Sequence, residues 1–369
     1  MEKNEIFVIY GKDIQAMAIR LAQEANLADL IGDRAKSIGL KPNLVTAKPA
    51  SGGATTHPEI AKGLIVYLKR NGFNNIAILE GAWTGCSTAQ AFDVCGYCKL
   101  ADETGVKLID TKRDKTKTCD CKGMKLEICE SALSTDFMIN LPVMKGHCQT
   151  RVTCALKNNK GLIPDREKSR FHTLGLTKPI AHLNTVIRND FIIVDAVCGD
   201  PDFELGGHPL QRGFLFSARD PVLCDTWATS QMGYSLGAIP YIGLAEKLGV
   251  GSADINSAKV RKLNGDGKSS AVNNTDKNAV SAPSGDKVRK LTPYIAEDKA
   301  CSSCYASLIF ALSAMSHGQL NQLKDKICIG QGFKGKHGNI GIGECCSGFK
   351  RFCPGCPPSG EEVLEFLKS

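Results

Sequence analysis

The feature that most constrains the fold is a repeated alternation of short apolar runs with amphipathic segments over the first two-thirds of the chain. Two of the apolar runs, FMINLPV and FIIVDAV, are hydrophobic enough for the middle of a parallel sheet. The alternation predicts an α/β fold: a mostly parallel sheet with helices on both faces. The predicted strands are IFVIYG (6–11), SIGLKPNLV (37–45), IAILEGA (76–82), KLIDT (107–111), FMINLPV (137–143) and FIIVDAV (191–197).

The segments between these runs carry helix signals. TTHPEIAKGLIVYLKRNG (55–72) opens with a threonine cap and an early proline, keeps helical periodicity and stops at Gly72. STAQAFDVCGYCKLADETG (87–105) predicts one further helix. DPVLCDTWATSQMG (220–233) and PYIGLAEKLGVG (240–251) complete the pattern.

A change of composition divides the chain. Residues 264–295 begin with a stretch rich in Gly, Ser and Asn and almost free of aromatic residues, which is typical of a solvated linker. We therefore expect an α/β domain over 1–263, a polar linker or loop over 264–295, and a small cysteine-rich α+β segment over 296–369.

Cysteine usage indicates metal chemistry in a reducing compartment. The chain has 17 cysteines among 369 residues, and its N-terminus, MEKNEIFVIYGKD, does not read as a secretory signal. No apolar run approaches the roughly 20 residues needed to cross a bilayer. We expect a cytoplasmic protein with no membrane partner, in which grouped thiols bind metal and scattered ones are buried.

The last 70 residues hold the most informative group of cysteines. Cys301-x2-Cys304 is followed by Cys345-Cys346 and by Cys353-x2-Cys356 with a proline after it. Four thiolates suit one [4Fe–4S] cluster, and a C-x2-C turn at a helix start delivers two of them beside free backbone amides. The rival interpretation is a zinc site, although the usual zinc-ribbon insert is only about 15–20 residues. Spacing alone does not decide which four cysteines bind.

The net charge of +8 favours anionic small molecules over nucleic acid. Lysine and arginine total 46 against 38 acidic residues, but they are spread along the chain without an aromatic-interleaved RNA motif. No Walker loop is present and no G-x-G-x-x-G opens a first helix, so an ordinary nucleotide enzyme is not expected.

Polar residues gather where the predicted strands end, which is where open α/β sheets place their ligands. Converging Lys, His and Asn side chains near a helix start suit a carboxylate or phosphate, and His147 has the titration range for acid–base work. We therefore predict His147, Lys145 and Lys157 as catalytic residues. The predicted ligand-binding residues are Lys41, Asn43, Thr56, His57, Asn158, Lys160, Asp165, Arg166, His172 and Asp195.

The remaining cysteines allow two interpretations. Cys148 and Cys154 are six residues apart, which on a helix puts them on different faces, so both are predicted to lie in the core. A second group could frame another metal site through Cys95-x2-Cys98 and Cys119-x-Cys121. That group comprises Cys86, Cys95, Cys98, Cys119, Cys121 and Cys129.

Several strings resemble the domain-of-unknown-function 362 family: KPNLV, GATTHPEIAKGLI, AFDVCGY, MKGHCQTRVTCALKNNKGLIPDREKSRFHT and VDAVCGDPDFELGGHP. The tail strings CSSC, IGECC and PGCPPSGEEVLEFL resemble the segment that often follows this domain. In that tail pattern the third cysteine follows "IG-x" and the fourth precedes "PP". The resemblance therefore implies Cys301, Cys304, Cys345 and Cys356 as the cluster ligands, with Cys346 and Cys353 as alternates.

The resemblance implies an iron–sulfur, ferredoxin-type protein of the kind found in anaerobes, without naming a substrate. A distant similarity to nickel-pincer lactate racemases accompanies it. The leading expectation is an oxidoreductase or electron carrier that couples one [4Fe–4S] cluster to an anionic small molecule, with a redox partner protein. The alternatives are a non-redox isomerase or lyase with a structural cluster, a scaffold that carries a cluster or cofactor, and a structural zinc protein.

Overall fold

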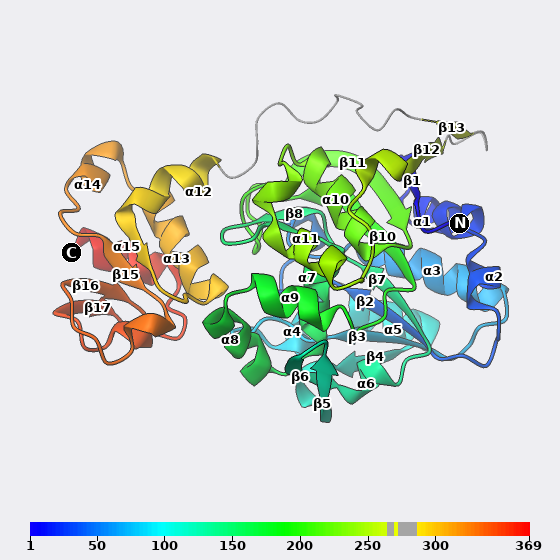
Figure 1. The fold of residues 1–369 in the computed structure, drawn as a ribbon, viewed down its shortest axis with the longest axis horizontal. Helices are drawn as coiled ribbons and strands as arrows, with labels where there is room; N and C mark the ends of the chain where they lie inside the picture. Colours follow the sequence, from blue (N-terminus) through cyan, green and yellow to red (C-terminus); the bar gives the residue numbers. More distant parts are fainter. Residues whose placement is uncertain (264–268, 272–285) are drawn as a thin grey trace.

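The protein folds into two lobes, shown in Figure 1, in a computed structural model that describes residues 1–263, 269–271 and 286–369. The larger lobe contains the N-terminal two-thirds of the chain. The smaller lobe, yellow to red in Figure 1, lies beside helix α8 (Asp165–Leu174) of the larger one.

A nine-stranded sheet forms the centre of the larger lobe. Five of its neighbouring pairs are parallel, which confirms the expected mostly parallel sheet. The six predicted strands all form, as β1, β2, β3, β4, β7 and β10. The strand order is β13 (Ser269–Ala271), β12 (Lys259–Leu263), β1 (Glu5–Tyr10), β11 (Leu210–Ala218), β10 (Phe191–Gly199), β7 (Phe137–Leu141), β2 (Ile38–Pro42), β3 (Ile76–Glu80) and β4 (Lys107–Asp110).

Strand β11 is the main departure from the predicted parallel order. It runs antiparallel to both β10 and β1 and separates β1 from the parallel group β10-β7-β2-β3-β4. Its sequence, LQRGFLFSA, carries arginine and glutamine at its start, so it lacks the long apolar run that marked the other strands.

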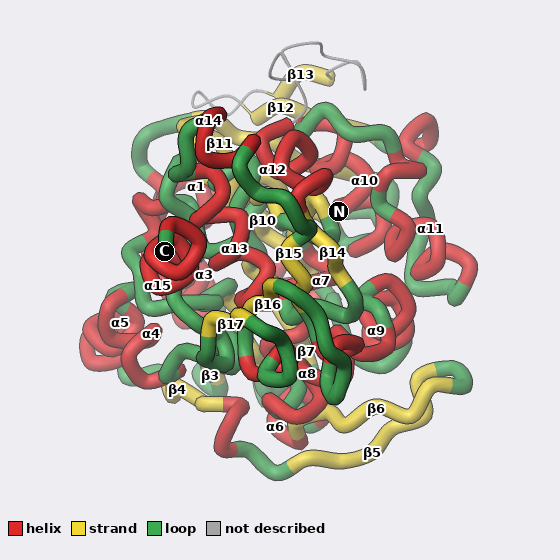
Figure 2. The backbone as a smooth tube through the Cα atoms, turned by 90° about the vertical axis from the view of Figure 1, so that its left-hand side faces the viewer, coloured by secondary structure: helices red, strands yellow, loops and turns green. Residues whose placement is uncertain are grey.

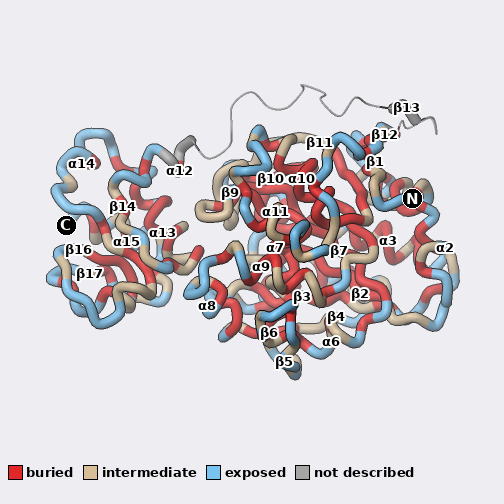
Figure 3. The backbone as a smooth tube through the Cα atoms, viewed as in Figure 1, coloured by how far each residue is buried: buried red, intermediate tan, exposed pale blue. Residues whose placement is uncertain are grey.

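Helices cover both faces of this sheet, because alternate side chains of each central strand enter two different cores. In β1, Ile6 and Val8 belong to one core, whereas Phe7 and Ile9 belong to the other. Figure 3 shows the resulting continuous buried interior. The second core includes α1 (Ile14–Glu24), α2 (Leu27–Ile31), α3 (Pro58–Arg70), α4 (Thr88–Val94) and α5 (Tyr97–Thr104). The first includes α6 (Glu130–Leu133), α7 (Ala155–Asn158), α8, α9 (Thr177–Leu183), α10 (Pro221–Gln231) and α11 (Pro240–Lys247).

One predicted helix is divided in two. The segment 87–105 was expected to be a single helix, but Gly96 adopts a φ of +80° between α4 and α5. A left-handed residue stops the regular hydrogen-bond ladder, and glycine adopts this conformation without steric cost. Two hairpins complete the lobe: β5 (Thr116–Cys121) with β6 (Met124–Cys129), and β8 (Lys145–His147) with β9 (Arg151–Thr153).

The smaller lobe has its own sheet and its own apolar core. Its four strands are all parallel, in the order β14 (Ile295–Glu297), β15 (Ile327–Ile329), β16 (Ile340–Ile342) and β17 (Arg351–Cys353). Figure 2 shows this sheet from the outer side of the lobe. The helices of the lobe are α12 (Asp286–Leu291), α13 (Ser302–Ser313), α14 (His317–Asn321) and α15 (Gly360–Lys368).

The predicted linker over 264–295 falls largely on residues 264–268 and 272–285, which lie outside the described residues. Its end is structured. Helix α12 places Val288 and Leu291 in the core of the smaller lobe, because side chains three residues apart share one helix face. At its start, β13 pairs with β12 at the edge of the central sheet.

Candidate functional site

A cavity lies where the carboxyl ends of β2 and β3 meet the start of α13. Its walls come from both lobes: the larger contributes the turn after α7, helix α8 and the segment around Glu204, and the smaller contributes Cys301 to Ser303. Of the predicted site residues, the cavity brings together Asn43, Lys157, Asn158, Lys160, His172 and Cys301.

Three lysines give the cavity a positive wall. Lys157 pairs with the carboxylate of Glu204, and the Lys160 ammonium lies 3.3 Å from Nε2 of His172. Lys168 donates to the carbonyl oxygens of Gly81 and Ala82. Burial, together with the positive charge of Lys157, lowers the pKa of Lys160 to about 7. An amine that titrates near neutral pH can both bind an anion and exchange a proton with it.

Glu204 is the central residue that sequence reasoning missed. Its carboxylate pairs with Lys157 on one side and with Nε2 of His147, at 2.9 Å, on the other. Although burial alone would raise it, the Lys157 ammonium and the ring N–H of His147 hold the pKa of Glu204 well below its usual range. The residue stands in the family-like string VDAVCGDPDFELGGHP, where three other acidic residues, Asp195, Asp200 and Asp202, left no signal that singled it out.

His147 and Lys145, predicted as catalytic residues, do not line this cavity, although His147 lines a second cavity together with His172. Nδ1 of His147 accepts hydrogen bonds from the backbone amides of Gln149 and Thr150, each at 3.1 Å. Because this nitrogen is an acceptor, Nε2 carries the ring proton and faces Glu204, and burial lowers the pKa of His147 to about 4. Lys145 donates to Asn43 Oδ1, to the carbonyl of Ala54 and to the carbonyl of Glu204. Both side chains therefore hold the Glu204 segment in place.

A buried ion pair fixes the floor of the cavity. Lys41 has no exposed surface, and its ammonium lies 2.9 Å from Glu80 Oε2. Glu80 also accepts from the amides of Leu44 and Gly81, each at 2.7 Å. A Cβ on Gly161 would lie 2.1 Å from Glu80 Oε1, so only glycine allows the turn after α7 to approach this pair.

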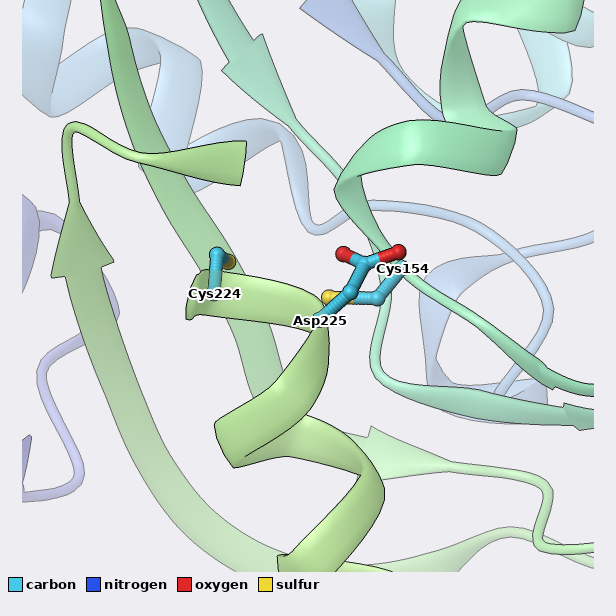
Figure 4. Close-up of side chains that lie close together, drawn as sticks. All are labelled: Cys154, Cys224 and Asp225. Atoms are coloured by element: carbon cyan, nitrogen blue, oxygen red, sulfur yellow. The ribbon is translucent and has the colours of Figure 1, made fainter. Parts of the chain in front are cut away.

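Asp225 positions the short helix α7, and Figure 4 shows its side chain beside that of Cys154. Its carboxylate accepts from the amides of Ala155 at 2.7 Å and Leu156 at 3.3 Å, which have no partner inside the helix. Cys154, Cys224 and Asp225 are buried, and their donor atoms all lie within 4.8 Å of one another. Since the carboxylate is already engaged by the backbone, we assign this group to the support of α7, and Cys154 lies in the core as expected.

Other predicted ligand residues have structural partners elsewhere. Thr56 bonds the carbonyl of Leu141, and His57 Nδ1 lies 2.8 Å from Asp195 Oδ2. Although burial opposes a charge on the ring, Asp195 raises the pKa of His57 to about 10. Arg166 pairs with Glu127 at the surface. Asp165 pairs with Lys112 and Lys168 beside the cavity.

Of the tail cysteines, Cys301 lines the cavity. Cys301 is the N-cap of α13 and Cys304 lies in its first turn, where the leading amides have no intrahelical partner. Gly343, next to the turn that holds Cys345, would place a Cβ 3.4 Å from Cys304 Sγ. Burial, and then charge on Cys301, Cys356 and Cys345, raises the pKa of Cys304. Cys301, Cys304, Cys345 and Cys356 influence one another electrostatically, although no three of their sulfurs lie within 4.8 Å of one another; four thiols are the donor set of an iron–sulfur centre.

The two alternates occupy different surroundings. Cys346 donates from its thiol to the carbonyl of Cys328 at 3.5 Å, and charge on Cys346 has a smaller effect on Cys304 than the other three thiols. Cys353 belongs to the apolar core of the smaller lobe, and its pKa is raised by burial and by Glu362.

In the described part of the chain, no three thiols of the predicted second metal group lie within 4.8 Å of one another, as is also true of the tail thiols. Cys95 donates to the carbonyl of Lys48 and Cys129 to that of Thr111. Among the described residues, no helix is both long enough and apolar enough to span a membrane.

Residues 38–230 match the family described as "Domain of unknown function (DUF362)". The chain belongs to this family. A thylakoid-associated protein of Synechocystis sp. is 23% identical over 229 residues, covering 59% of this chain and 69% of that protein. A solved lactate racemase apoprotein from Thermoanaerobacterium thermosaccharolyticum aligns with a TM-score of 0.41 and 13% identity, over 61% of this chain and 56% of that one. The DUF362 match contains the three cavity lysines and Glu204 but ends before the tail cysteines.

Replacing Glu80 with Gln should destabilise the protein by about 3–5 kcal/mol, because it leaves Lys41 as an uncompensated buried charge. Urea unfolding at pH 7 measures this loss. Glu127→Gln is the matched control at an exposed pair and should cost about 1 kcal/mol or less. Equal losses for the two variants would contradict the assigned role of the buried pair.

His57→Gln should remove a pH-dependent part of the stability. The folded pKa of about 10 exceeds the unfolded value of about 6.5, so the ion pair with Asp195 contributes fully below pH 6.5. That contribution is lost as pH rises through 10. The difference in free energy of unfolding between wild type and His57→Gln should therefore be largest at pH 6 and shrink toward pH 10; a constant difference would refute the charged pair.

Proposed function

We propose that this DUF362 protein is an iron–sulfur redox protein. In this proposal Cys301, Cys304, Cys345 and Cys356 bind one [4Fe–4S] cluster, and the lysine-lined cavity binds an anionic small molecule. The observation that carries it is the place of Cys301, which belongs to the thiol group and also lines the cavity opposite Lys160 and Lys168.

The chain's own residues account for ligand binding. Lys157, Lys160 and Lys168 supply charge-assisted donors, and Ser302 and Ser303 present the start of α13 from the other side. These groups suit a carboxylate or a phosphate. Lys160, with a pKa of about 7, is the residue best placed to take up or release a proton.

When bound, the cluster supplies one electron at a time. The proximity of the cluster to the cavity wall favours electron exchange with the ligand. A redox partner protein would supply the next electron. The smaller lobe is the side from which such a partner would approach, because it carries the thiols.

A second candidate is a non-redox enzyme or a cofactor-binding scaffold with a structural cluster. The observation in its favour is that the DUF362 match includes the cavity lysines and Glu204 but excludes the tail cysteines. In this candidate the cavity lysines and Glu204 carry the ligand chemistry, and the thiols hold a structural cluster.

Anaerobically purified protein should be brown and contain iron and acid-labile sulfide in equal amounts. Cys304→Ser should abolish the chromophore and the paramagnetic resonance signal of the reduced cluster, because one of four thiolates is lost. Cys328→Ser is the matched control, since Cys328 lies on β15 and its thiol faces the carbonyl of Lys326. A colourless wild-type protein that contains zinc would refute the cluster.

Inorganic phosphate should bind in the cavity, and Lys160→Met should weaken it about tenfold or more, since a hydrogen bond to a charged group contributes about 1.5–3 kcal/mol. Calorimetry measures the affinity. Binding of sulfate, whose charge stays constant in this range, should weaken for wild type between pH 6 and 8 as Lys160 loses its proton. Lys99→Met, at a side chain 84% exposed, is the control and should bind as wild type does.

The same ligand separates the two candidates. A redox role predicts that phosphate shifts the midpoint potential of the cluster, because charge in the cavity acts on Cys301. An unchanged potential at saturating phosphate would favour the structural cluster.

A further inference from the structure

Gln331 connects the thiol group to the larger lobe. Its side-chain Nε2 donates to Cys301 Sγ at 3.5 Å and to the backbone carbonyl of Ser169 at 3.3 Å. Its Oε1 accepts from the hydroxyl of Thr173 at 3.0 Å. One side chain of the smaller lobe thus contacts a cysteine sulfur and two residues of helix α8.

The chemistry of its partners fixes the orientation of this amide. In the flipped orientation Oε1 would face a carbonyl oxygen and a sulfur, both of which are acceptors. In the observed orientation each N–H of Nε2 meets one acceptor and the oxygen meets a hydroxyl that can donate. The N–H directed at Cys301 is therefore determined by its neighbours.

The backbone around Gln331 is equally constrained. Its amide donates to the carbonyl of Lys299, and Gly330 has a φ of +125°. A Cβ on Gly330 would lie 2.1 Å from the carbonyl oxygen of Asp298, and one on Gly332 would lie 2.0 Å from the Asp298 side chain. Glycine on both sides lets this turn lie against the segment that leads into Cys301.

We propose that Gln331 is a positioning residue that sets the reduction potential of the cluster through its hydrogen bond to Cys301 and links the cluster to α8. This inference rests on the proposed function. Reduction adds negative charge to the cluster and its sulfurs, so an N–H donor stabilises the reduced state and raises the potential. Helix α8 also carries Lys168 and His172 of the cavity. A ligand that contacts these side chains can therefore affect Cys301 Sγ through α8 and Gln331.

The test compares Gln331→Leu with wild type by potentiometric titration, followed by paramagnetic resonance. The variant keeps the bulk of the side chain and removes the donor, so the midpoint potential should become more negative while the iron content stays the same. Thr173→Val, on α8, removes the hydroxyl that orients the amide and should shift the potential in the same direction by less.

Gln149→Leu is the matched control. Gln149 also bridges the lobes, through Glu297, Ala300 and Ser302, but its side chain donates to oxygen atoms only. Its replacement should leave the potential unchanged. An unchanged potential in Gln331→Leu, or an equal shift in Gln149→Leu, would overturn the role of Gln331 while leaving the cluster itself intact. A wild-type protein without a cluster would overturn the proposed function as well.

Discussion

The pairing of Lys41 with Glu80 is the interaction on which the rest of the site depends. Both charges are almost fully buried at the carboxyl ends of neighbouring parallel strands, where an unpaired charge would be strongly destabilising. The Glu80 carboxylate also accepts hydrogen bonds from the amides of Leu44 and Gly81. One carboxylate therefore holds the loops that follow β2 and β3. Gly161 then allows the lysine-bearing turn after α7 to close over the pair.

Other buried charges near this pair are also neutralised or hydrogen-bonded by neighbouring groups. Glu204 neutralises Lys157, and Lys145 and His147 hold the Glu204 segment in place. Each cation of this inner region has an oxygen partner, as buried charge requires. Lys160 differs, because its nearest polar neighbour is the ring of His172, and its pKa falls to about 7. The cavity therefore combines a fixed, neutralised shell with one lysine that can respond to a ligand.

The two lobes meet at this cavity through polar contacts and a small apolar one. Gln149 and Gln331 each form hydrogen bonds across the boundary, and Cys148 and Phe203 of the larger lobe pack against the core of the smaller one. The site consequently exists only when the lobes are docked. The smaller lobe contributes Cys301, Ser302 and Ser303 to the wall of this cavity.

The sequence by itself determined the α/β architecture, since apolar runs and helix caps are local signals that neighbouring residues carry. It also identified the family strings, the C-x2-C pair and the lysines after the strands. Only the tertiary structure decided that His147, Lys145 and His57 have structural partners, and that Glu204, Gln331 and the antiparallel β11 complete the arrangement. These features depend on contacts between residues distant in the chain, such as Gln331 with Thr173. Such contacts leave no periodic trace in the sequence, because a single polar side chain reads the same whether it faces water or a buried partner.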